Sequence, residues 1–154
     1  MTNLYVFALL IGVVCGLRSM TAPAIVCWGA HLGWFNLAGS PLAFLAHPAS
    51  LVVFGLMAIG ELIADKFPQI PRRTEIGPLM VRVVLGAMCG GALAISVHPA
   101  LVAGAVLGGL GGILGAFGGF YARRAAASKL HPIAAALLED VVAIAGGFFA
   151  VSRF

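Results

Sequence analysis

The length of its apolar runs is the feature that most constrains this chain. Between Leu101 and Tyr121 there is no charged side chain, and glycine occurs eight times. Five predominantly apolar segments fill most of the sequence: Asn3 to Leu17, Ala49 to Asp65, Ile76 to Val97, Leu101 to Tyr121 and Pro132 to Ser152. A helix of about 20 apolar residues matches the hydrocarbon thickness of a bilayer. We therefore predict an all-α, polytopic transmembrane helix bundle.

The composition excludes a water-soluble domain of ordinary type. Of 154 residues, 62% are hydrophobic and 9% are charged, and such a balance is typical of membrane proteins. The apolar segments leave no room for a soluble domain, so residues 1–154 are predicted to form one integral membrane domain. The net charge of +4 does not indicate nucleic acid as a partner, because the basic residues lie in connecting links without interleaved aromatic side chains.

Arg18 ends the first apolar run, and the residues around it interrupt a helix. Gly16 loosens the helix, and Pro23 cannot occupy a helix interior. Ser19 or Thr21 can cap a new helix that has Pro23 in its first turn. An arginine in hydrocarbon costs roughly 2.5–3.5 kcal/mol on insertion scales. We predict that the first segment is discontinuous near Arg18, as in transporters whose broken helices line a substrate site.

Residues 22–46 leave the number of crossings open between five and six. Trp28 and Trp34 suit a membrane interface, so this stretch either bends along the outer interface or forms a sixth, poorly helical crossing. With six crossings, residues 1–66 and 76–152 would each hold three helices of opposite orientation. That arrangement is the inverted-repeat plan of many small transporters.

Three segments carry charges at a similar predicted depth in the inner half of the bundle. Glu61 lies near the end of the second segment, Arg82 about 9 Å inside the third, and Asp140 about 12 Å inside the fifth. Buried charges in a membrane pair with one another or face water, so we expect Arg82 to pair with one of these acids. Glu139 points about 100° away from Asp140 and therefore needs a different partner. Such a set either locks the bundle or forms a solute or proton site.

Under the functional interpretation, Arg18 would bind an anionic group together with Ser19 and Thr21. A guanidinium and a helix N-terminus both attract anions, and here they are adjacent. The structural alternative for Arg18 is a salt bridge to one of the acids.

The remaining charges would then handle protons or a coupling cation. We assign that role to Glu61, Asp65 and Asp140, and the role of counter-charge to Arg82 and Lys66. Asp65 shares a helix face with Glu61, although it could also be a solvated helix terminus.

The fourth segment contains two stripes in which glycine recurs at every fourth residue. The stripes are Gly104-Gly108-Gly112 and Gly111-Gly115-Gly119. Small residues at this spacing let helices approach closely in membranes. We predict that one stripe packs inside the protomer and that the other packs across a homo-oligomer interface.

No motif indicates a metal, a cofactor or a catalytic nucleophile, and we expect none of them. The three cysteines lie in apolar runs without ligand spacing. Histidine precedes proline at positions 47, 98 and 131, where proline in the first helical turn explains the pairs. A histidine metal site is the sharper alternative for them. An enzymatic function is accordingly less expected than transport.

Four motifs in order resemble a known family over nearly the whole chain. They are Gly-Leu-Arg-Ser-Met-Thr-Ala-Pro at 16–23, Glu-Leu-Ile-Ala-Asp-Lys at 61–66, Pro-Arg-Arg-Thr at 71–74 and Leu-Glu-Asp at 138–140. They resemble a group of small bacterial inner-membrane proteins known only as a domain of unknown function. The resemblance implies a multi-pass inner-membrane location, no particular activity, and these hallmark residues: Arg18, Glu61, Asp65, Lys66, Arg73 and Asp140.

The favoured hypothesis is a small membrane transporter or channel for a small charged, anionic solute, with proton coupling as one version. Its expected partners are membrane lipids, the solute and further copies of the chain. Two alternatives use the same charges. One is a membrane-embedded enzyme that handles a lipid phosphate, and the other is a non-catalytic structural subunit of a membrane complex.

The basic residues predict the orientation. They gather in residues 66–75 and 122–131, which the positive-inside rule places in the cytoplasm, with the C-terminus outside. In a variant without native cysteines, a cysteine at position 98 should react with a membrane-impermeant maleimide added outside, and one at position 126 should not. Labelling of position 126 alone would reverse the predicted topology.

Overall fold

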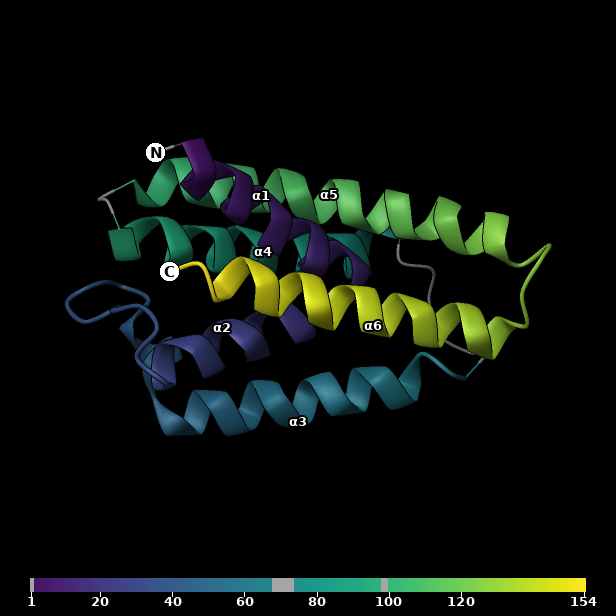
Figure 1. The fold of residues 1–154 in the computed structure, drawn as a ribbon, viewed down its shortest axis with the longest axis horizontal. Helices are drawn as coiled ribbons and strands as arrows, with labels where there is room; N and C mark the ends of the chain where they lie inside the picture. Colours follow the sequence, from purple (N-terminus) through teal and green to yellow (C-terminus); the bar gives the residue numbers. More distant parts are fainter. Residues whose placement is uncertain (1, 68–73, 98–99) are drawn as a thin grey trace.

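The described part of the chain is all-α, as predicted. The structure is a computed structural model that describes residues 2–67, 74–97 and 100–154. These residues form six α-helices, one short 3-10 helix and no strand (Figure 1): α1 (Thr2–Leu17), α2 (Thr21–His31), η1 (Ala43–Ala46), α3 (Pro48–Ala64), α4 (Ile76–Val97), α5 (Leu101–Ala126) and α6 (Pro132–Val151). The hallmark Arg73 and the pair His98-Pro99 lie outside the described residues.

Among the described helices, three are long and apolar enough to cross a membrane. They are α4, α5 and α6, whereas α1 and α3 are apolar but shorter. Residues 22–46 contain one short helix, α2, which ends at His31, and the chain then turns irregularly until η1.

The chain reverses direction at Arg18. α1 ends at Leu17 and α2 begins at Thr21 with Pro23 in its first turn, which is where the sequence predicted a break. In Figure 1, α2 runs back toward the end of the bundle at which α1 begins. Arg18 is therefore at the tip of a hairpin of two short helices, inside the bundle.

Both termini lie at the same end of the bundle. α1 begins there and α6 ends there, while α3 and α5 end, and α4 and α6 begin, toward the opposite end (Figure 1). The helix ends that flank the two basic links therefore share one end of the molecule.

The fourth predicted segment is longer than expected. α5 continues past Tyr121 through Arg123 and Arg124 to Ala126, so half of the predicted link 122–131 is helical. A prediction based on hydropathy places the end of a segment before its first charged residues. Alanine and arginine nevertheless favour a helix, and arginines in the last turn interact favourably with the helix dipole.

One glycine stripe of α5 packs against α1. A Cβ added at Gly115 would stand 2.9 Å from the Cα of Gly16, and one at Gly111 would stand 2.8 Å from the backbone N of Val13. A distance below 3.0 Å means that the backbones themselves would have to separate, so these positions accept only glycine without a shift.

The other stripe packs against α4. A Cβ at Gly86 would stand 2.6 Å from the carbonyl oxygen of Gly108, and one at Gly112 would stand 2.7 Å from the carbonyl oxygen of Arg82. Both stripes therefore serve contacts inside one protomer. The prediction that one of them forms an oligomer interface is wrong, because the hairpin helix α1 occupies that face.

Alanine at Gly115 should destabilise the fold by about 1–3 kcal/mol, because its methyl group overpacks the α1–α5 contact. Gly118→Ala is a matched control, since nothing lies within 4 Å of a Cβ at that position. There the better helix propensity of alanine should stabilise by up to about 1 kcal/mol. Melting temperatures in detergent would compare the two variants, and equal effects would contradict the assigned contact.

Candidate functional site

Arg18 is the centre of a buried set of charges. Its side chain is 1% exposed, and its NH1 donates to Asp65 Oδ2 at 2.5 Å while its NH2 pairs with Asp140. Asp65 is the C-cap residue of α3, and Asp140 is buried within α6. One guanidinium thus joins carboxylates from two helices, and the salt bridge left open by the sequence is present twice.

Glu61 reaches from α3 to the start of α2. Its Oε1 accepts hydrogen bonds from the backbone N–H of Ser19 at 2.8 Å and from the Ser19 hydroxyl at 2.5 Å. Its Oε2 accepts from the backbone N–H of Met20 at 2.8 Å. The N–H groups predicted to hold an external anion are therefore occupied by a carboxylate of the protein itself.

The prediction that Ser19 or Thr21 caps α2 is wrong. Met20 occupies the N-cap position without a side-chain hydrogen bond. A charged carboxylate accepts hydrogen bonds more strongly than a hydroxyl does, and Glu61 takes the cap function from a distant helix. Thr21 lies beside the site, and its hydroxyl oxygen has no hydrogen-bond partner within the described part of the chain.

Arg82 binds the end of α1, the first helix of the hairpin. Its Nε donates to the carbonyl oxygen of Gly16 at 3.1 Å, in the last turn of α1, and its NH1 donates to the carbonyl oxygen of Pro78 at 3.2 Å. Its NH2 lies 3.8 Å from Glu61 Oε1. The predicted pairing of Arg82 with one of the acids is confirmed. We call Arg18, Glu61, Asp65, Arg82 and Asp140 the ion network.

Two predicted residues have other places. Lys66 is exposed at the end of α3, and the structure gives it no ion pair with any described residue, so it does not belong to the ion network. Gly119 is buried and lines a cavity between α5 and α6.

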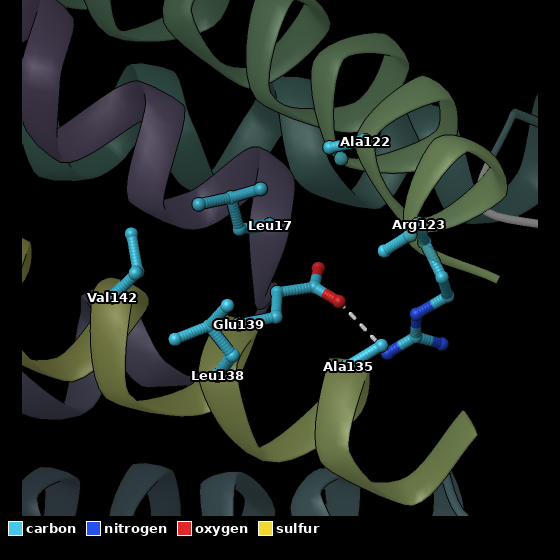
Figure 2. A pocket seen from close by; sticks show the side chains of 9 residues that line it. Leu17, Ala122, Arg123, Ala135, Leu138, Glu139 and Val142 are labelled. Atoms are coloured by element: carbon cyan, nitrogen blue, oxygen red, sulfur yellow. Dashed lines mark hydrogen bonds and ion pairs between the residues drawn. The ribbon is translucent and has the colours of Figure 1, made fainter. Parts of the chain in front are cut away.

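Glu139 faces away from the ion network, as the helical geometry predicted. It pairs with Arg123 of α5, whose NH2 lies 2.8 Å from Glu139 Oε2 (Figure 2). Sequence reasoning gave Arg123 no role, because it placed this residue in a link. The continued alanine and arginine composition beyond Tyr121 was the signal that could have placed Arg123 on the helix.

The ion network has no obvious metal-binding geometry. Among the residues that the structure describes, no three histidine, cysteine, aspartate or glutamate side chains could hold one metal ion. Each carboxylate of the network instead accepts hydrogen bonds from arginine, hydroxyl or backbone N–H donors. The interactions that the structure shows at this site are therefore ion pairs and hydrogen bonds.

Fold and site together define an all-α bundle in which three of the described helices could cross a membrane and whose interior holds paired arginine and acidic side chains. The chain belongs to the family described as a domain of unknown function (DUF4126), whose model matches residues 6–153. The family resemblance seen in the sequence is thereby confirmed. No curated protein and no solved structure matches the chain, so its function has to be argued from the site.

Arg18→Ala should destabilise the protein by about 3–5 kcal/mol, because Asp65 and Asp140 would lose their shared guanidinium in a buried setting. Adding Asp140→Asn should recover much of the loss, since one unpaired charge disappears. Arg124→Ala removes an exposed arginine and should change little. Thermal melting of all three variants in detergent would measure these changes in stability. An Arg18→Ala protein as stable as the Arg124→Ala control would contradict the network.

Proposed function

We propose that the protein is a small membrane transporter in which protonation of the ion network releases Arg18 to bind an anionic solute. Arg18 carries the proposal, because it is buried where two short helices meet and is shared by acids from α3 and α6. A proton on Asp65 or Asp140 would neutralise that acid and weaken its pairing. The freed guanidinium edge would then match a carboxylate or phosphate, which arginine binds in a bidentate manner.

An unused donor on Arg18 supports an anionic or oxygen-rich solute. Its Nε is buried and has no hydrogen-bond partner among the described residues. A buried N–H group without an acceptor is unfavourable. A solute oxygen on the edge of the guanidinium that Nε shares with NH2 would supply the missing acceptor.

The packing of α3 supports a movable element. α3 packs mainly against α2 and η1, and its acids Glu61 and Asp65 bind the tip of the hairpin. Protonation of these two acids would loosen α3 from the tip and uncover the start of α2. Proton uptake and solute access would thereby be coupled in one step.

The directions of the helices support six segments in the membrane, with both termini outside the cytoplasm. Helices α1 to α3 and helices α4 to α6 then form halves of opposite orientation, as in inverted-repeat transporters. The interfaces differ between the halves, since α4 and α5 share a long contact and α1 and α2 a short one. We extend the proposal to a bacterial inner membrane, with oligomerisation through a surface other than the glycine stripes.

A structural role is the second candidate, and the bonding of Glu61 favours it. Both oxygens of this carboxylate are hydrogen-bonded, and Arg82 lies beside it. A network of this kind could lock the bundle without binding any solute.

Flux into liposomes would separate the two candidates. Protein reconstituted with an internal pH-sensitive dye should carry protons inward when acetate, succinate, phosphate or chloride is supplied on one side. Arg18→Ala should abolish this flux, and Arg18→Lys should retain part of it, because lysine keeps the charge but not the bidentate geometry. Asp140→Asn should uncouple protons from the anion, whereas Arg124→Gln should behave as wild type.

The absence of flux for every anion in a folded wild-type protein would contradict transport. Rescue of Arg18→Ala stability by Asp140→Asn, together with that absence, would leave the structural role as the function of the network.

A further inference from the structure

The space between α5 and α6 is not used by the ion network. These consecutive helices make few contacts with each other. Between them lies a cavity of about 190 Å³, larger than the ~150 Å³ apolar cavity that holds benzene in an engineered protein. Apart from Arg123 and Glu139, its lining is apolar (Figure 2): Leu17, Gly119, Ala122, Leu138 and Val142 are among the lining residues.

A second, more polar cavity adjoins the first. It measures about 270 Å³, shares Arg123 and Ala135 with the apolar cavity, and adds Lys66 and the first residues of α6. The two cavities meet at Arg123 and Ala135. We refer to them together as the cleft, which has charged residues in its polar part and mostly apolar residues in the other.

Three sources of positive charge face the polar cavity. The NH2 of Arg123 donates a hydrogen bond to Glu139, but the Nε of Arg123 is buried without a hydrogen-bond partner in the described residues. Lys66 is exposed and has no ion pair with any described residue. The start of α6, at Pro132, contributes the positive end of a helix dipole. Asp65 also lines the cavity, but its Oδ2 is held by Arg18.

We propose that this cleft binds one anionic phospholipid. The phosphate lies between Arg123, Lys66 and the start of α6, and one acyl chain enters the apolar cavity toward Val142. Charge and polarity both fit this occupant, since basic pockets between membrane helices on the cytoplasmic side bind anionic head groups. The cations lie at the end that carries the basic links, where head groups are found, and the apolar cavity runs inward as an acyl chain does.

The proposal is independent of transport and is tested by lipid titration. Native mass spectrometry of the detergent-solubilised protein would compare dioleoyl phosphatidylglycerol with dioleoyl phosphatidylcholine. We expect stronger binding of phosphatidylglycerol, and a loss of about tenfold in its affinity for Lys66→Gln/Arg123→Gln, because charge-assisted hydrogen bonds are removed. Arg124→Gln, which removes one positive charge from the neighbouring residue outside the cleft, should bind as wild type.

A second variant keeps the test valid if loss of the Arg123–Glu139 pair unfolds the protein. Ala122→Phe changes no charge and fills the apolar cavity, so it should weaken binding of phosphatidylglycerol and leave binding of soluble glycerol phosphate unchanged. Equal affinity for the two lipids would overturn the proposal. So would equal losses for Arg124→Gln and Lys66→Gln/Arg123→Gln, or full phosphatidylglycerol affinity in a folded Ala122→Phe protein.

Discussion

The pairing of Arg18 with two carboxylates is the interaction on which the rest of the structure depends. It joins the tip of the α1–α2 hairpin to the end of α3 and to the middle of α6. Charges in an apolar interior are tolerated only when they are paired, so this guanidinium ties the positions of the α1–α2 hairpin, α3 and α6 to one another. The dependence is greatest for α3, which packs mainly on α2 and η1 and otherwise holds to the bundle through Asp65 and Glu61.

Charged side chains also make the broken helix possible. A helix that stops inside an apolar bundle exposes backbone groups that no water can satisfy. Here Glu61 accepts hydrogen bonds from the backbone N–H groups that precede α2, and Arg82 donates a hydrogen bond to a carbonyl oxygen at the end of α1. The same residues lie 3.8 Å apart, so the charges that a helix break requires neutralise one another. Glu61 and Arg82 thus both satisfy the backbone groups at the helix break and pair with each other, which explains why charged residues gather at this place in so apolar a chain.

The glycines of α5 determine which neighbouring helices pack closely against it. Because α5 presents bare backbone to both α1 and α4, these three helices pack closely. α6 makes few contacts with α5, and Arg123 bridges the two helices through its ion pair with Glu139. The close contacts of α5 with α1 and α4 are thus accompanied by a looser α5–α6 contact, at which the cavity lies.

The sequence by itself determined the long apolar helices, the break at Arg18 and most of the buried charges. These follow from hydropathy, proline and glycine, which act within a few residues. Only the tertiary structure decided the partners. Asp65 and Asp140 lie 47 and 122 residues from Arg18, and a distant Glu61 replaced the local caps expected from Ser19 and Thr21. The glycine stripes were visible, but the helices that fill them were not, because contacts distant in sequence depend on how whole helices pack.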